Sequence, residues 1–241
     1  MAFELFKSFR PGRLATVVLF LLAFLFATLG TWQTNRAADK EAIEQEHRAA
    51  TALPLELALA RDARFARIEV NGEYDSNRHI LLDNQVWQGR AGVFVFTPFY
   101  TVGGITILVN RGWLPLAPGR KSMPQIPTPQ HETVLKGMLN TSPVAGRILG
   151  SRDELRKDGW PQLVTYLNLA DISDSLGVSL EDRIIQLSQS EQDGFEGRDW
   201  KPVFLSSSRH RGYAFQWFAL TAASFAMWLV TGFRNPSGHD K

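Results

Sequence analysis

The stretch that decides the fold is Gly212–Phe233, with the sequence GYAFQWFALTAASFAMWLVTGF. None of its 22 residues is charged, and Arg211 and Arg234 flank it. At about 1.5 Å of rise per residue, a helix of this length spans the roughly 30 Å hydrocarbon core of a bilayer. The sequence therefore predicts a transmembrane helix over 212–233.

A second apolar run, Leu14–Trp32, lies near the start of the chain. A cleavable signal peptide is the rival interpretation, but its apolar region is usually about 7–15 residues long and ends at a small-x-small site. This run is longer, and its end at 29–33 reads LGTWQ, without such a site. We therefore expect a second, retained transmembrane helix over 14–35.

The charges of the two tails predict the orientation of these helices. Residues 1–13 carry a net charge of +2 and residues 234–241 carry +1, within a total of +2 for the chain. Short basic tails favour the cytoplasmic side of a membrane. The leader is too short and too poor in serine for a typical organelle transit peptide. We expect a multi-pass protein of the bacterial inner membrane with both tails cytoplasmic and residues 36–211 periplasmic.

The middle of the chain is rich in short β-type runs that end at glycine, proline or Asx turns. The first helix should continue through Arg36–Ala50 and stop at Pro54, and a short helix is expected over Leu169–Leu176. The predicted strands are 68–74, 80–84, 93–100, 106–111, 133–139, 163–167 and 183–187. The expected fold is an α+β membrane protein, in which two transmembrane helices flank an antiparallel β-rich domain, a small barrel or sandwich.

Composition excludes several classes of function. The chain has no cysteine, which rules out thiol redox chemistry and thiolate-bound copper, zinc or iron–sulfur sites. Its pI near 9.0 comes without a basic patch that carries interleaved aromatic residues, so no nucleic acid is expected as a partner. No nucleophile–base set, carboxylate pair or phosphate-binding loop has a recognisable spacing. We do not expect an enzyme.

The lead-in to the last helix contains the best candidate for a metal ligand, His210. A lone histidine is most often an ordinary polar residue at a helix start, but neutral imidazole is also the commonest metal ligand, and a single histidine often holds haem iron. Tyr213 and Trp217 follow at helical spacing and could form an apolar wall for a macrocycle. Arg209 and Arg211 could meet its carboxylates.

Two Trp–Gln pairs are expected at similar depth near the outer surface of the membrane, Trp32-Gln33 and Gln216-Trp217. Interfacial tryptophan is ordinary in membrane proteins. A glutamine amide that faces lipid lacks hydrogen-bond partners and should seek a helix or a ligand. The candidate cofactor-binding residues are therefore His210, Tyr213, Gln216, Trp217, Trp32 and Gln33, with His210 as the metal ligand. The other histidines have no metal-ligand spacing and are interpreted as surface residues: His47, His79, His131 and His239.

Helical periodicity also predicts how the two helices pair. The first helix has a stripe of small residues from which Trp32 projects away: Ala23, Ala27 and Gly30. The second has alanines on the side opposite His210 and Trp217: Ala219, Ala222, Ala223 and Ala226. Small residues let helix backbones approach closely in lipid. We expect the two stripes to meet and to leave the His210 face free.

Four motifs occur in order along the chain. They are LGTWQTNR at 29–36, VNGEY at 70–74, VNRGW at 109–113 and HRGYAFQWF at 210–218. With the two flanking apolar segments, they resemble the Surfeit locus protein family of cytochrome c oxidase assembly factors, and the resemblance covers nearly the whole chain.

The resemblance implies a membrane chaperone of the respiratory chain that assists the maturation of oxidase subunit I around the insertion of haem a. It implies haem binding at the position of His210. The implied partners are subunit I of cytochrome c oxidase or another haem-copper oxidase, haem a synthase and membrane lipid. The alternative is a scaffold that stabilises an assembly intermediate without touching haem. Copper delivery is excluded, because Cu(I) carriers use thiolate ligands.

Overall fold

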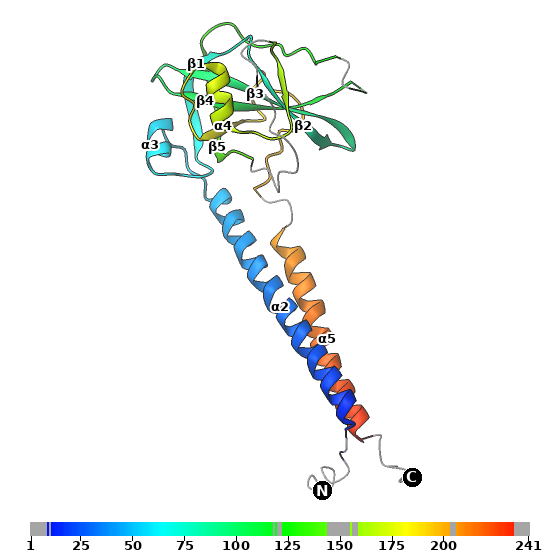
Figure 1. Cartoon of the computed structure of the whole chain (residues 1–241). Helices are drawn as coiled ribbons and strands as arrows, with labels where there is room; N and C mark the ends of the chain where they lie inside the picture. The colour runs from blue at the N-terminus through cyan, green and yellow to red at the C-terminus, as the bar shows by residue number, and fades with distance from the viewer. Residues whose placement is uncertain are drawn as a thin grey trace. The chain divides into compact units, whose positions relative to one another are not determined.

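The computed structural model describes residues 9, 11–117, 119, 122–143, 155, 159–202 and 206–233. The chain divides into two compact units. Residues 1–45 and 202–241 form a helical unit, and residues 46–201 form a β-rich domain (Figure 1). Each unit is described below by itself.

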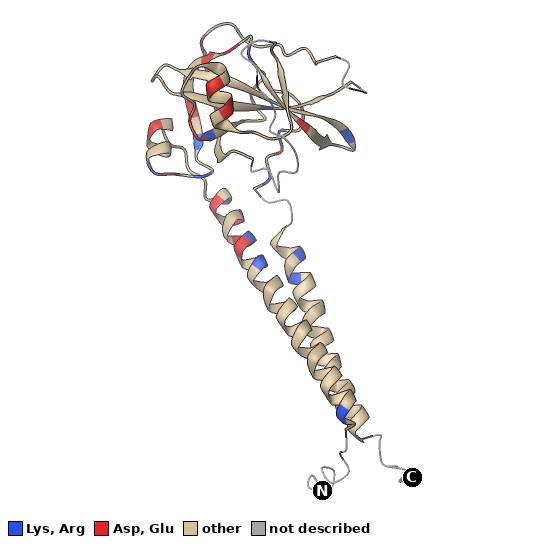
Figure 2. Cartoon of the chain, in the orientation of Figure 1, with Lys and Arg blue, Asp and Glu red and all other residues tan. Residues whose placement is uncertain are grey.

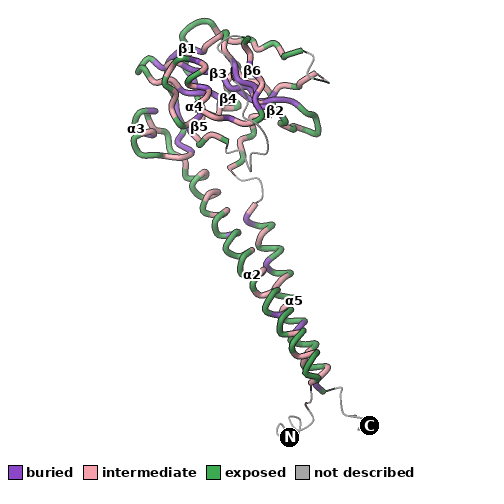
Figure 3. Tube along the Cα trace, in the orientation of Figure 1, coloured by how far each residue is buried: buried purple, intermediate pink, exposed green. Residues whose placement is uncertain are grey.

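The helical unit pairs α2 (Arg13–Arg48) with α5 (Ser207–Phe233), which lie side by side (Figure 1). The charged residues gather towards the ends of these helices and leave their middles uncharged (Figure 2). Both helices are long and apolar enough to cross a membrane. Most of their residues are exposed (Figure 3), among them Phe24 at 74% and Phe215 at 75%. Such a continuous apolar surface is what a lipid environment would cover.

The ends of the first helix differ in part from the prediction. As expected, α2 continues beyond its apolar part, but it ends at Arg48, before Pro54. Pro54 instead precedes a helix that the sequence pattern missed, α3 (Leu55–Ala60). Proline is well suited to a helix start, because its fixed φ is already helical and the first amide hydrogens have no partner within the helix.

The described residues of the β-rich domain form seven strands in one sheet. They are β1 (Arg67–Tyr74), β2 (Ile80–Trp87), β3 (Arg90–Thr101), β4 (Thr106–Pro115), β5 (Thr133–Thr141), β6 (Gln162–Val164) and β7 (Arg183–Leu187). Their order is β1-β5-β7-β4-β3-β2-β6, and β1 also pairs with β3. The β1–β3 pairing closes five strands into a small barrel, and β2 and β6 continue the sheet from β3. Every predicted strand is present, although β2, β3 and β4 are several residues longer and β6 is shorter than expected.

The sheet is not wholly antiparallel, contrary to the prediction. β4 runs parallel to β7, and β2 runs parallel to β6. The first pairing has a geometric cause, because a closed ring with an odd number of strands cannot alternate in direction all the way round. β7 lies between β4 and β5, so it must be parallel to one of them. Neither parallel pair is sequential, as expected for strands that need a long crossover connection.

The described core has three clusters: one inside the barrel, one under α4 (Leu169–Leu176) and a smaller one around Leu81, Val93 and Val95 of β2 and β3. The barrel interior includes Phe99, Ile107 and Leu135, each no more than 1% exposed. α4 has the predicted bounds. Asn168 caps its start by accepting hydrogen bonds from two backbone amides, and Gly177 ends it with a left-handed φ of 69°. A left-handed residue at this position is the common way to end a helix.

Candidate functional site

The first turn of α5 is held against α2 by side chains that the sequence analysis did not pair. The backbone N–H and the hydroxyl of Ser207 donate hydrogen bonds to the two carboxylate oxygens of Glu44, each at 3.1 Å. Arg211 donates to Glu41 in an exposed ion pair. A carboxylate at a helix start satisfies a free amide and complements the helix dipole. These contacts fix the start of α5. His210 lies between Ser207 and Arg211 in the sequence.

His210 is joined to Gln33, so the structure brings together two of the predicted site residues. The distance between His210 Nδ1 and Gln33 Oε1 is 2.7 Å. A carbonyl oxygen can only accept a hydrogen bond, so Nδ1 is the protonated nitrogen in this arrangement. In the neutral imidazole, Nε2 then carries the lone pair, and it has no hydrogen-bond partner among the described residues. This is the arrangement in which a histidine ligates a metal through Nε2 while a second group fixes its tautomer.

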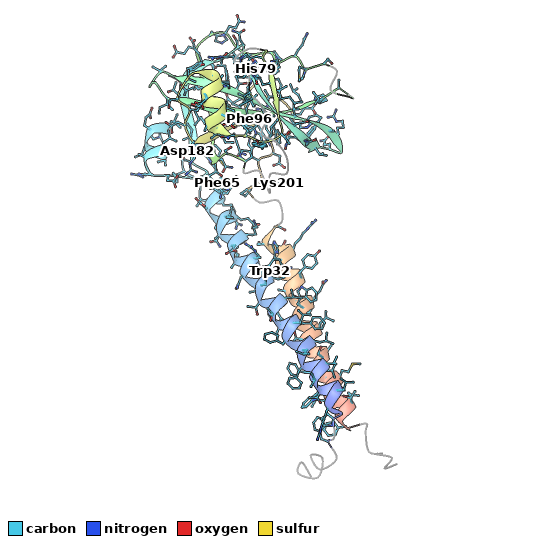
Figure 4. The ribbon with its side chains drawn as sticks, in the orientation of Figure 1. Trp32, Phe65, His79, Phe96, Asp182 and Lys201 are labelled. Carbon is cyan, nitrogen blue, oxygen red and sulfur yellow. The ribbon has the colours of Figure 1, made fainter. Side chains whose placement is uncertain are left out.

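The remaining predicted site residues lie around this contact without touching it. Trp217 stacks on Phe26 of α2, with ring centroids 5.7 Å apart and an angle of 24° between the planes. Tyr213 is 49% exposed and Trp32 is 50% exposed, and Trp32 projects from α2 (Figure 4). Gln216 is also exposed.

The two Trp–Gln pairs are therefore not level with one another, contrary to the prediction. Gln33 reaches His210, whereas Trp217 reaches Phe26. Residue 217 lies seven positions, or about 10 Å, further along α5 than residue 210. The two helices are antiparallel, so this step moves Trp217 towards the start of α2.

The face of α5 that packs against α2 is the opposite of the one that was predicted. Ala23 and Gly30 of α2 are buried, as expected. The alanines 219, 222, 223 and 226 of α5, however, are exposed. The face of α5 that meets α2 is the one that carries His210, and its buried or half-buried residues are Ser207, His210, Ala214, Trp217, Thr221, Ser224, Trp228, Thr231 and Gly232.

Large rings from α5 fill the space that the small residues of α2 leave. A Cβ atom at Gly30 would lie 2.8 Å from the ring of Phe218. Trp228 packs edge-on against Phe20 at 5.4 Å and donates a hydrogen bond to Thr16. Helices in lipid associate through packing and interhelical hydrogen bonds. A large ring against a small residue provides more contact than two facing alanines, and His210 and Trp228 on this face of α5 hydrogen-bond to α2.

The prediction that the histidines of the β-rich domain are surface residues is wrong for His79. His79 is only 4% exposed and lies within 3.0 Å of Thr97 Oγ1 and 3.2 Å of the Ser76 carbonyl (Figure 4). Burial, together with the nearby charge of Arg111, lowers the pKa of His79 to about 4. His131 is exposed as predicted, and His239 lies outside the described residues.

His47 is half-buried, and it also departs from the prediction. Its ring packs edge-on against Phe65, with centroids 5.1 Å apart. Burial, and secondly the charge of Arg67, lower the pKa of His47. The imidazole is therefore predominantly neutral near pH 7.

Arg111, in the motif VNRGW, is a structural residue that the motif alone did not explain. It lies in β4 and is 1% exposed. Its guanidinium donates to the carbonyls of Asp193 and Pro127 and to the hydroxyl of Thr128. It thereby ties two loops to the barrel. A charged residue inside an otherwise apolar strand was the available signal, because buried arginine must be fully hydrogen-bonded.

Among the residues that the structure describes, no group of three or more His, Asp and Glu side chains could hold a metal ion.

Comparisons with known proteins place these features in a family. The model of the SURF1 family matches residues 20–222. The chain is 28% identical over 199 residues to an uncharacterized SURF1-like protein of Mycobacterium tuberculosis, which covers 77% of this chain and 71% of that protein. It is 25% identical over 231 residues to a SURF1-like protein of Rickettsia felis, covering 89% and 96%. It is 24% identical over 226 residues to Surfeit locus protein 1 of Takifugu rubripes, covering 84% and 90%.

Proposed function

Because this chain belongs to the SURF1 family, which is generally associated with cytochrome oxidase assembly, we propose that it assists the maturation of oxidase subunit I by binding haem a and handing it over. His210 serves as the iron ligand. The observation that carries the proposal is the 2.7 Å contact between His210 and Gln33, since it leaves Nε2 available for a metal.

The residues around His210 suit an amphipathic macrocycle. Trp217 and Tyr213 follow His210 on α5 and offer aromatic surface. Arg211 is engaged with Glu41, whereas Arg209 is exposed and has no carboxylate partner among the described residues. A guanidinium is well suited to a carboxylate. Arg209 is therefore the residue that we assign to a haem propionate.

The proposed location is the bacterial inner membrane, with both tails in the cytoplasm and the β-rich domain in the periplasm. Two apolar helices near the two ends of the chain support a membrane protein, and the net basic tails support the orientation. His210 then lies at the outer end of the second span, where amphipathic aromatic residues are common.

A scaffold that binds subunit I without haem is the second candidate. It is supported by the exposed alanines 219, 222, 223 and 226 of α5. These exposed small residues offer a surface against which another transmembrane helix can pack closely. The two functions are compatible, because the scaffold face and the His210 face lie on opposite sides of α5.

Visible spectroscopy of the full-length protein, purified from cells that make haem a, tests the first candidate. We expect a Soret band in the wild type that is clearly weakened in His210→Ala and unchanged in His131→Ala, a matched exposed histidine. A wild-type protein without pigment, or a pigment unchanged in His210→Ala, would remove His210 from the proposal. Retained co-purification of subunit I with His210→Ala would then support the scaffold.

A further inference from the structure

The β-rich domain has a cavity of about 500 Å³ that is distinct from the His210 contact. Its floor is the outer surface of β1, β5 and β7, where Arg67, Met138 and Gln186 are aligned across neighbouring strands. His47 and Trp200 also line it. The volume is within the range of about 300–1,000 Å³ that is usual for pockets that bind small molecules and cofactors.

The tryptophan and the histidine of this cavity are held in place. The indole N–H of Trp200 donates to the Leu187 carbonyl at 2.7 Å, so the ring forms a fixed apolar wall. His47 packs on Phe65 through a ring contact. Neither ring nitrogen of His47 has a hydrogen-bond partner among the described residues. Phe65, the ring on which His47 packs, and Lys201, the residue after Trp200, are labelled in Figure 4.

The charges of the cavity favour an anion. It is lined by three cations, Arg67, Lys136 and Arg198, and by two carboxylates, Glu69 and Asp199. Glu69 is paired with Lys136 at 3.6 Å, and Asp199 is paired with Lys201, outside the lining, at 3.1 Å. Arg198 is hydrogen-bonded to backbone carbonyls, which do not cancel its charge. Arg67 has no carboxylate partner among the described residues.

Together, the lining residues of this cavity fit one class of ligand. A half-buried imidazole, a thioether and an indole ring offer iron ligation and apolar contact, and the surplus of arginine charge offers a partner for carboxylates. We propose that this cavity is a second porphyrin site, in which His47 binds the iron of a haem and Arg67 meets a propionate. The inference rests on the proposed haem-handling function and adds a place on the β-rich domain from which, or to which, the haem moves.

Titration of the full-length protein in neutral detergent with ferric protoporphyrin IX tests the site, with the Soret band as the readout. In a His210→Ala background, we expect binding that is weakened about tenfold or more by His47→Ala and unaffected by His131→Ala. His47→Gln serves as a milder variant, and thermal melting confirms that each protein is folded. Indistinguishable titrations of the His47 and His131 variants in this background would overturn the inference.

Titration with metal-free protoporphyrin IX separates iron ligation by His47 from propionate binding by Arg67. This porphyrin lacks iron, so His47→Ala should not weaken its binding, whereas Arg67→Glu should weaken it about tenfold. Arg61→Glu, an exposed arginine outside the cavity lining, is the control. Equal effects of the Arg67 and Arg61 variants would also overturn the site.

The outcomes distinguish this inference from the proposed function. Loss of all haem binding in His210→Ala supports the proposed function and overturns the second site. Binding that is unchanged in His210→Ala but lost in His47→Ala supports the cavity and contradicts the role of His210. Haem binding that is retained in the double variant His210→Ala/His47→Ala contradicts both the proposed role of His210 and the second site.

Discussion

At the scale of single residues, the environment of each histidine decides what it can do. His210 has one ring nitrogen engaged by Gln33, His79 is enclosed between Thr97 and Ser76, and His47 borders a cavity. Their sequence neighbourhoods do not separate these cases. The distinction comes from side chains that are distant along the chain.

The Gln33–His210 contact predicts the tautomer of His210. Nitrogen-15 NMR of the ligand-free protein should show a protonated Nδ1 and an unprotonated Nε2. Gln33→Ala should give a mixture of tautomers, because nothing then selects one nitrogen, and should weaken haem binding by about tenfold or more. Gln45→Ala, at an exposed glutamine of α2 outside the candidate site, is the control. A protonated Nε2 in the wild type would show that Gln33 does not position the ring.

The lowered pKa of buried His79 predicts that the stability of the protein depends on pH. Its pKa is lowered to about 4 in the folded protein from an ordinary value of 6.5, so the unfolded state binds more protons between these values. The free energy of unfolding should therefore fall as the pH is lowered from about 6.5 towards 4, by roughly 3 kcal/mol in total. Thermal unfolding at several pH values measures this.

His79→Asn is the comparison for that experiment. It keeps a polar side chain but removes the group that titrates, so its stability should change less over the same interval. An identical slope in the wild type and the variant would assign the pH dependence to other groups.

At the scale of elements, the helix pair shows that a stripe of small residues needs a partner of suitable volume. Gly30 accommodates the ring of Phe218, and the alanines of α5 lie elsewhere. The ring of Trp217, which looked free in the sequence, packs against Phe26 of α2. Helix periodicity identified both faces of α5, but it could not decide which face meets α2.

Cross-linking distinguishes the two pairings, and the chain has no native cysteine to interfere. The double variant Thr16→Cys/Trp228→Cys should be joined by a short bifunctional thiol reagent, because these side chains are 3.1 Å apart. Ala27→Cys/Ala223→Cys should react poorly, because residue 223 is exposed on the other side of α5. The opposite result would restore the pairing of the two alanine stripes.

At the scale of the whole molecule, two candidate membrane helices flank a β-rich domain with a small closed barrel. Two spans require that both ends of the chain lie on one side of the membrane, and the tails are net basic. Asn77→Cys in the β-rich domain should therefore react with an impermeant thiol reagent added to the periplasm. Lys7→Cys and Ser237→Cys should react only after the inner membrane is opened. Labelling of Lys7→Cys from the periplasm would contradict the proposed orientation.

Much of this architecture could be predicted, because its signals are local. Strand runs, turn residues and the caps of α4 lie within a few positions of the structures they specify. The site was predicted less completely. Gln33 and His210 were both selected, but not as partners, and the roles of Glu41, Glu44 and Arg111 depend on contacts with residues far along the chain.

The sequence by itself determined the two apolar helices, the β-rich middle, the absence of thiol chemistry and the family, because composition, periodicity and motifs are properties of the chain. The tertiary structure alone decided which face of α5 meets α2, that the barrel includes a parallel pair, and which nitrogen of His210 stays available. These features depend on packing volume, on the closure of a five-stranded ring and on a hydrogen bond between residues 177 positions apart, and no local pattern encodes them.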